Sequence, residues 1–256
     1  MFTRALVRPP GRSFARGLTT SGLGPPIYEL ALEQHAAYCA ALESCGLSLI
    51  RLEADERHPD STFVEDTAIL AEGCAVATRP GAPSRRGEVA AVRAALARRF
   101  PAVSDIAAPA TVDGGDICQA GRRFFIGVTA RTDEAGAGQL AAILEAHGYA
   151  ATLVDIRAIP GLLHLKSGLA SLGDNRLLLA DELADHAAFA DFERVPVAAD
   201  EAYAANCVRV NGHVLVPAGY PGVQSALGAL GYATIALDMS EFQKMDGGLS
   251  CLSLRF

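Results

Sequence analysis

Short hydrophobic runs recur in pairs along the chain, and a tight polar turn separates the two members of each pair. Residues 65–81 read EDTAILAEGCAVATRPG, with the turn at Glu72-Gly73. Three similar pairs occupy residues 115–129, 167–181 and 205–219. The last of these turns at Asn211-Gly212, the strongest short hairpin signal. The pattern therefore predicts four β-hairpins.

Each predicted hairpin is followed by a segment with helical spacing of its apolar residues, and then by an extended stretch. In residues 88–100, for example, Val89, Val92, Leu96 and Phe100 fall on one stripe of a helix. The predicted helical or partly helical segments are 88–100, 134–147, 182–192 and 223–230. The extended stretches after them are 102–109, 151–160, 195–199 and 233–239.

The repeating unit is therefore strand, turn, strand, helix, strand, with a period of roughly 40 to 50 residues. A fifth unit begins with the strand predicted in residues 249–256, but the chain ends there. Its second strand is available in residues 2–10, followed by a predicted helix over 28–45. Five units could then close into a ring through pairing of the two termini, which would leave no free sheet edges. The alternative is an ordinary α/β sheet whose hairpins resemble one another by chance.

Composition narrows the classes of protein to consider. Half of the residues are hydrophobic, a fifth are charged, and the net charge is −7, which argues against a nucleic-acid-binding face. No apolar run approaches the roughly 18 residues of a membrane span. The six cysteines lack zinc-type spacing, and a chain of this size does not need disulfides, so we expect a cytoplasmic protein.

The first 24 residues contain four arginines and no acid, which is also the composition of a mitochondrial transit peptide. Pro9 and Pro10 would interrupt a targeting helix, and the ring needs the first strand for its closure. We therefore expect this segment to be part of the folded protein.

Polar residues that could carry chemistry fall at the same point of each repeat, close to the start of its first strand. They are Asp60, Glu65 and Asp66, then Asp113 and Asp116, then His164 and Lys166, then Asn206, and finally Asp246 and Cys251. Taken singly, these motifs also fit a solvated acidic loop, a glycine turn, a core histidine and a small buried thiol. In a closed ring, however, the equivalent positions would meet at the axis and form a site.

A thiol together with a histidine suits nucleophilic catalysis. Neighbouring carboxylates would raise the pKa of the thiol unless a cation lay between them. A guanidinium ligand is such a cation, and arginines in segments 79–88 and 130–136 could hold a carboxylate at its other end. The residues therefore indicate a pocket for an arginine-like amino acid.

Several motifs together resemble one family from end to end. They are PDSTFVED, TRPGAPSRRGE, DGGD, ARTDEAG, LHLKSG, YAANC and the terminal KMDGGLSCLSLRF. In this order they are similar to dimethylarginine dimethylaminohydrolase of the guanidine-modifying (pentein) superfamily. The resemblance implies an α/β fold, a five-bladed α/β propeller of ββαβ repeats, which agrees with the five units above. We expect residues 1–256 to form a single catalytic domain of this kind.

The resemblance also implies roles for individual residues. Cys251 would be the nucleophile, His164 the general acid and base, and Asp113 a carboxylate on the guanidinium, in a position where some relatives carry glutamate. Of the implied substrate contacts, Asp66 would bind the guanidinium, and Arg85 (rather than Arg86) and Arg131 would bind the α-carboxylate. Asp60, with the carbonyls of Leu18 and Met245, would bind the α-ammonium group. The remaining residues of the pocket would be Phe63, Glu65 and Asp246.

The implied activity is hydrolysis of Nω-methylated arginines to citrulline and an amine, with no metal or cofactor and with the small-molecule substrate as the partner. An arginine deiminase acting on unmethylated arginine is the alternative, although the connections between units look short for its inserted domain. A ribosome anti-association factor of the same fold would be a non-catalytic alternative, but it should lack the thiol, histidine and acids together. The chain could be a monomer or a homodimer.

Overall fold

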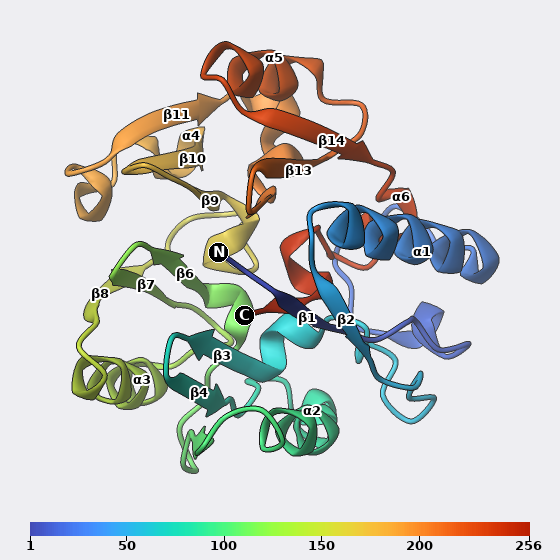
Figure 1. The fold of residues 1–256 in the computed structure, drawn as a ribbon, viewed down its shortest axis with the longest axis vertical. Helices are drawn as coiled ribbons and strands as arrows, with labels where there is room; N and C mark the ends of the chain where they lie inside the picture. The colour runs from blue at the N-terminus through green and yellow to red at the C-terminus, as the bar shows by residue number, and fades with distance from the viewer.

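The computed structural model describes residues 1–256 and consists of five three-stranded sheets arranged around an axis (Figure 1). The first sheet along the chain contains β1 (Arg4–Val7), β2 (Ser48–Arg51) and β15 (Leu254–Arg255). The others are β3 (Ala68–Ala71), β4 (Cys74–Ala77) and β5 (Ser104–Asp105); β6 (Ile117–Ala120), β7 (Arg123–Val128) and β8 (Ala150–Asp155); β9 (Leu169–Gly173), β10 (Arg176–Ala180) and β11 (Glu193–Val197); and β12 (Val208–Val210), β13 (His213–Pro217) and β14 (Ala233–Leu237). The predicted five-bladed ββαβ propeller is confirmed.

In each sheet the middle strand runs antiparallel to one neighbour and parallel to the other. The antiparallel pair is the predicted hairpin, and the parallel strand returns after a helical connection, as parallel pairing requires. The two termini complete one sheet, because β1 pairs antiparallel with β15, with Ala5 opposite Arg255 and Leu6 opposite Leu254. Both chain ends therefore lie together near the centre of the ring (Figure 1).

The longer helices α1 (Tyr28–Ser44), α2 (Val89–Leu96), α3 (Glu134–Ala146) and α5 (Pro221–Ala229) lie on the outside of the ring (Figure 1). Two short helices, α4 (Asp181–Ala184) and α6 (Ser240–Gln243), lie in connections that follow strands. Their apolar faces pack on the sheets: Leu140 and Leu144 of α3, for instance, share a buried cluster with Phe124 and Ile126 of β7. Burial of each such side chain contributes about 1.5–3 kcal/mol. None of these helices combines the length and apolar character that spanning a membrane would require.

Several predicted elements are shorter than the sequence pattern indicated, such as the helix predicted over 88–100, of which α2 forms only Val89–Leu96, and three further differences bear on the fold. The segment 182–192 forms only α4 and a 3₁₀ turn at Ala187–Phe189, because it buries few apolar side chains, chiefly Leu183 and Phe189. The stretch 102–109 pairs only at β5, between Pro101 and Pro109, which cannot donate to a strand ladder.

The third difference concerns Cys251, which does not lie in a strand. Residues Ser250–Leu252 form a 3₁₀ turn, and β15 begins only at Leu254. The turn is held by hydrogen bonds from the Ser250 N–H to Asn206 Oδ1 (3.0 Å) and from the Cys251 N–H to the Gly248 carbonyl (3.2 Å). The thiol therefore precedes the strand of the fifth blade.

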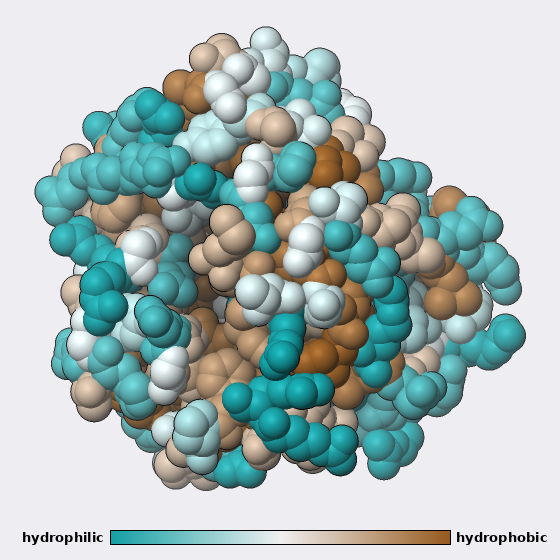
Figure 2. Space-filling view, viewed as in Figure 1, coloured by the Kyte–Doolittle hydropathy of each residue, from teal (hydrophilic) through white to brown (hydrophobic).

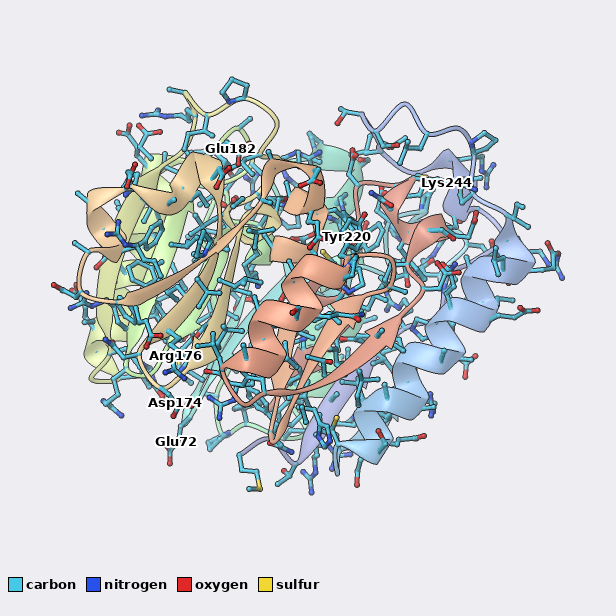
Figure 3. The ribbon with its side chains drawn as sticks, turned by 90° about the horizontal axis from the view of Figure 1, so that it is seen from above. Glu72, Asp174, Arg176, Glu182, Tyr220 and Lys244 are labelled. Atoms are coloured by element: carbon cyan, nitrogen blue, oxygen red, sulfur yellow. The ribbon has the colours of Figure 1, made fainter.

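The two ends of the ring differ in their construction. Glu72 and Asp174 lie in hairpin turns at one end, whereas Glu182 and Lys244 lie towards the other (Figure 3). The 3₁₀ turns that precede the first strand of several blades are Val64–Thr67, Gly114–Asp116, Leu165–Ser167 and Ser250–Leu252. Because they come from different blades and pack near the axis, they bring residues far apart in sequence into one site.

Candidate active site

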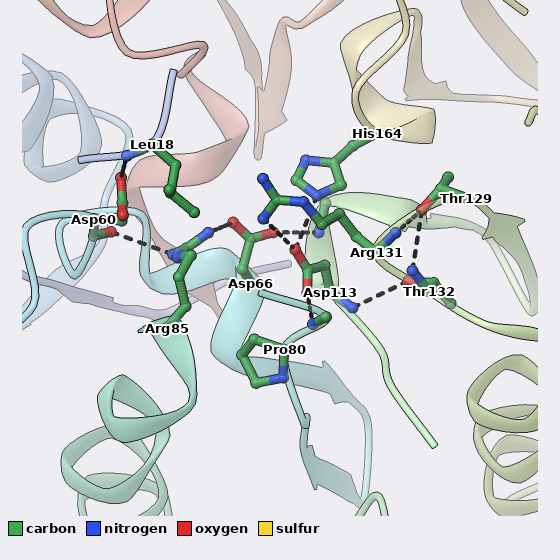
Figure 4. A network of polar contacts seen from close by, with 12 residues as sticks. Leu18, Asp60, Asp66, Pro80, Arg85, Asp113, Thr129, Arg131, Thr132 and His164 are labelled. Atoms are coloured by element: carbon green, nitrogen blue, oxygen red, sulfur yellow. Dashed lines mark hydrogen bonds and ion pairs between the residues drawn. The ribbon is translucent and has the colours of Figure 1, made fainter. Parts of the chain in front are cut away.

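A narrow pocket lies near the axis, and most of the predicted site residues line it. The lining residues are Leu18, Asp60, Phe63, Asp66, Arg85, Arg131, Leu163, His164, Met245, Asp246, Gly247 and Cys251. Two predicted residues are not part of this lining. Asp113 is fully buried but contacts His164 and Arg131, and Glu65 lines a different cavity. Figure 4 shows the polar network around the pocket.

Asp66 belongs to the 3₁₀ turn that precedes β3, and backbone and side-chain donors hold its carboxylate in place. Oδ1 accepts a hydrogen bond from the Gly115 N–H at 2.8 Å, and Oδ2 accepts one from Arg85 Nη1 at 2.5 Å (Figure 4). Burial alone would raise the pKa of Asp66, but the Arg85 guanidinium, with His164, outweighs burial and lowers the pKa to about 2. Asp66 is therefore a fixed negative charge in the pocket.

Asp113 precedes the Gly114–Asp116 turn and faces His164. Its Oδ1 accepts a hydrogen bond from the Gly81 N–H at 2.8 Å, and its Oδ2 lies 3.1 Å from His164 Nε2. Gly115 permits this close approach, because a Cβ at this position would lie 2.7 Å from His164 Nδ1. The DGGD motif thus requires glycine beside the imidazole.

His164 is buried among carboxylates, which determine its charge. Burial by itself lowers the pKa of His164, but the charges of Asp116 and Asp66 and the hydrogen bond to Asp113 raise it to about 9. The imidazole is therefore protonated at neutral pH. Asp116 also fixes the backbone here, because its Oδ1 accepts a hydrogen bond from the Leu165 N–H at 3.0 Å.

The Cys251 thiol is the nucleophile candidate, and its surroundings favour the neutral form in the ligand-free pocket. Burial and the nearby charges of Glu65 and Asp66 raise its pKa to about 12. A cation bound between the thiol and these carboxylates would reverse the electrostatic part of this effect. The site thus has a thiol that requires a positively charged ligand for its activation.

Arg85 is buried, and nearly all of its donors are already used inside the protein. Nε and Nη2 donate to Glu88, Nη1 donates to Asp66, and Nη2 also lies 3.2 Å from the carbonyls of Asp60 and Phe63. Of its five N–H groups, a single one on Nη1 remains for a ligand. Arg86, the other arginine of the motif, instead donates to the Pro80 carbonyl.

Arg131 is less constrained than Arg85. Its Nη1 lies 3.6 Å from Asp113 Oδ2, and its side chain keeps about a fifth of its surface exposed. It can therefore turn towards a ligand and offer a planar pair of N–H groups, which suits a carboxylate.

Sequence reasoning missed Glu88, which is almost completely buried and accepts two hydrogen bonds from Arg85, at 3.1 Å and 2.8 Å. The only available signal was its position three residues after Arg85, at the start of the predicted helical segment 88–100, because side chains three residues apart lie side by side when the backbone is helical. Burial outweighs the nearby Arg85 guanidinium and raises the pKa of Glu88 to about 7, so Glu88 is only partly ionised at neutral pH. Glu88, Arg85 and Asp66 form a continuous buried chain of hydrogen bonds that ends in the pocket.

The segment around Leu18 covers the pocket. The Leu18 N–H donates to Asp60 Oδ1 at 3.0 Å, the Thr20 N–H donates to Asp246 Oδ2 at 2.6 Å, and the Thr19 hydroxyl donates to the Lys244 carbonyl at 2.7 Å. The free volume beneath is only about 30 Å³, room for a few water molecules. The hydrogen bonds that hold the covering segment are mostly at exposed positions.

Glu65 lies behind the pocket rather than in it. Its carboxylate accepts a hydrogen bond from the Ser250 hydroxyl at 2.7 Å and is paired with Lys166 Nζ at 2.5 Å and with Arg255 Nη2 at 3.5 Å. Together these groups close the axis below Cys251. The expected direct contact of Glu65 with a substrate is therefore not supported by its position.

Three side chains could in principle hold a divalent cation. Asp66, Asp113 and His164 each offer a ligand atom, and these atoms all lie within 4.8 Å of one another. His164 would have to lose its proton first, because only the neutral imidazole is a ligand.

Comparisons with known proteins agree with this geometry. The family model "Arginine deiminase" matches residues 56–209. The dimethylarginine dimethylaminohydrolase of Pseudomonas aeruginosa is 48% identical over the whole of both chains. A crystal structure of dimethylarginine dimethylaminohydrolase, a histidine-to-glycine variant as its adduct with S-methyl-L-thiocitrulline, superimposes with a TM-score of 0.97, 47% identity and complete coverage of both chains.

A further solved structure, the P. aeruginosa enzyme as a cysteine-to-serine variant complexed with citrulline, has the same TM-score, identity and coverage. Full-length identity at this level, together with the same propeller, establishes common membership. The chain belongs to the dimethylarginine dimethylaminohydrolase family.

Proposed function

We propose that this protein hydrolyses Nω-methylated arginines, such as asymmetric dimethylarginine and monomethylarginine, to citrulline and dimethylamine or methylamine. The observation that carries the proposal is the joint placement of a thiol, a protonated imidazole, buried carboxylates and an adaptable arginine around one pocket. The relatives support it, because one is named for this reaction and a solved structure of it contains citrulline.

Each charged group of the substrate would be held by protein side chains of the opposite charge. Asp66 and Asp113 would accept N–H groups of the guanidinium, since each carboxylate keeps lone pairs that its present partners do not use. Arg131 would supply most of the α-carboxylate binding, with one N–H added by Arg85. Asp60 would receive the α-ammonium group, together with the carbonyls of Leu18 and Met245.

The docked cation would then favour the Cys251 thiolate, whose proton passes to solvent. The sulfur attacks the guanidinium carbon and gives a tetrahedral adduct. His164, protonated at neutral pH, donates its proton to the departing dimethylamine or methylamine nitrogen as the C–N bond breaks. A covalent S-alkylthiouronium remains on Cys251.

Neutral His164 would then accept a proton from water, which attacks the same carbon. The C–S bond breaks, citrulline leaves, and the thiol and imidazolium are restored. One water is consumed, and one amine and one citrulline are released. The residues needed for these steps belong to the propeller of residues 1–256, which we propose acts as one catalytic domain.

The test is release of citrulline and dimethylamine from asymmetric dimethylarginine, with plain arginine in parallel and a chelator present. We expect turnover of the methylated substrate, and none by Cys251→Ser, which should keep the fold. Ammonia from arginine as the main product would instead assign the protein as a deiminase. Turnover that depends on added metal would contradict the mechanism. A monomeric or homodimeric state and a cytoplasmic location stay predictions.

A further inference from the structure

A second, much larger cavity opens at the other end of the ring, where the hairpin turns lie. Its volume is about 1030 Å³, in the upper range of ligand-binding cavities. Turn residues such as Gly73, Gly121 and Gly173 line it together with the N-terminal Met1 and Phe2. The same face is hollowed near its centre in the space-filling view (Figure 2). The Glu65–Lys166 pair separates the cavity from the pocket of Cys251.

The charge of this cavity is opposite to that of the whole protein. Six cationic residues line it, Arg4, Arg99, Arg122, Lys166, Arg209 and Arg255, against two carboxylates, Glu65 and Glu72. The Met1 ammonium group and the Phe256 carboxylate at the chain ends cancel, and Arg209 is paired with Asp174, which leaves an excess of three positive charges. The complete chain, in contrast, has 22 basic and 29 acidic residues and a net charge of −7. A recess that is lined by charges of one sign and by apolar walls focuses the electric field and concentrates ligands of the opposite charge.

Several of these cations have N–H groups to spare. The side chains of Arg4 and Arg99 make no hydrogen bond or ion pair within the protein. At the floor of the cavity, Lys166 and Arg255 both pair with the one carboxylate of Glu65. One of these two positive charges is therefore not neutralised at the floor. Phe100 and Phe256, in tilted contact, add an apolar wall. Charged donors and aromatic surface in one recess are the usual parts of a small-ligand site.

We propose that this cavity is a second binding site, distinct from the pocket of Cys251, for a small anion that carries two or more negative charges on phosphate or carboxylate groups. Arg4 and Arg99 would bind the anion at the rim, and Lys166 and Arg255 would attract it from the floor. Guanidinium groups offer paired N–H donors to either chemical group.

Isothermal titration of the full chain with pyrophosphate and with citrate, at low ionic strength, tests the proposal and distinguishes the two anion classes. We expect at least one of the probes to bind. The double variant Arg4→Gln/Arg99→Gln should bind it about tenfold more weakly, which corresponds to about 1.4 kcal/mol, while its hydrolytic activity stays unchanged.

Two control variants each remove one arginine charge outside the cavity. Arg157→Gln changes an exposed arginine that pairs with Glu134 outside the cavity, and Arg131→Gln changes the cation of the opposite pocket. Both should retain wild-type affinity for the probe. No binding of either probe at millimolar concentration would overturn the proposal. Equal losses of affinity in the double variant and in Arg157→Gln would also overturn it, as would a loss of affinity in Arg131→Gln. The binding measurements do not depend on the proposed hydrolase activity.

Discussion

Glu88→Gln tests the idea that a buried chain of hydrogen bonds holds Asp66, the proposed guanidinium-binding carboxylate, in place. In the wild type, the two oxygens of Glu88 accept N–H groups from Arg85 Nε and Nη2, at 3.1 Å and 2.8 Å, and Arg85 Nη1 binds Asp66. A glutamine has the same shape but a single acceptor oxygen. Its NH₂ group would face one N–H of Arg85, so that donor would lose its partner inside the protein.

The expected loss of stability follows from these contacts. A hydrogen bond between charged groups contributes about 1.5–3 kcal/mol, and leaving a buried donor unsatisfied adds a further desolvation cost of similar size. We expect the free energy of unfolding to fall by about 2–4 kcal/mol, measured by urea denaturation at about pH 8.5, where Glu88, with a pKa raised to about 7 by burial, is ionised. Because Arg85, the donor that orients Asp66, would lose part of its anchor at Glu88, kcat/KM for asymmetric dimethylarginine should also fall by about tenfold or more at the same pH, in line with about 1.4 kcal/mol per factor of ten.

Glu134→Gln is the matched control, because it makes the same substitution in an exposed pair with Arg157. Solvent screens such pairs, so this variant should unfold like the wild type and keep full activity. If the two variants lost equal stability, or if Glu88→Gln kept wild-type kcat/KM, the buried chain would not position Asp66 and the reasoning would be refuted.

Three further predictions concern single residues of the pocket. Gly115→Ala places a methyl group 2.7 Å from His164 Nδ1 and should lower kcat strongly with little change in KM. The control Gly138→Ala in α3 places its methyl group in open space and should leave both kinetic constants unchanged. His164 has a pKa of about 9 when folded, above its ordinary 6.5, so its contribution to stability is complete below about pH 6.5 and is lost as the pH rises through 9. Unfolding free energies measured over this range should therefore decline more in the wild type than in His164→Gln, and parallel curves would contradict the assignment. Arg131→Gln should raise KM more than it lowers kcat, because the proposed role is substrate binding, and an unchanged KM would exclude that role.

Much of the fold could be predicted from the sequence because it repeats. Hairpin signals such as Asn211-Gly212 are local, and each unit contains the same order of runs and turns. The closure between β1 and β15 was also predictable, because the fifth unit lacked one strand and the N-terminus offered it. Segments that bury few apolar side chains, such as 182–192, were overestimated, since spacing alone does not reveal how much surface a segment will bury.

The set of residues around the pocket was likewise accessible from the sequence, since Asp66, Asp113, His164 and Cys251 occupy equivalent points of the repeats. What each of them contacts was not. Glu65 and Asp66 are neighbours in sequence, yet in the 3₁₀ turn they have different partners, Lys166 for Glu65 and Arg85 for Asp66. Glu88 had no motif of its own and gained its place only through the folded position of Arg85.

The sequence by itself therefore determined the repeat, the ring closure and the kinds of chemical group that meet at the axis, because these depend on local pattern and on order along the chain. The tertiary structure decided the charges and the space available to those groups. The pKa values of His164 and Cys251, the nearly saturated donors of Arg85 and the covered pocket all depend on burial and on contacts between distant blades. Those contacts exist only once the ring has closed.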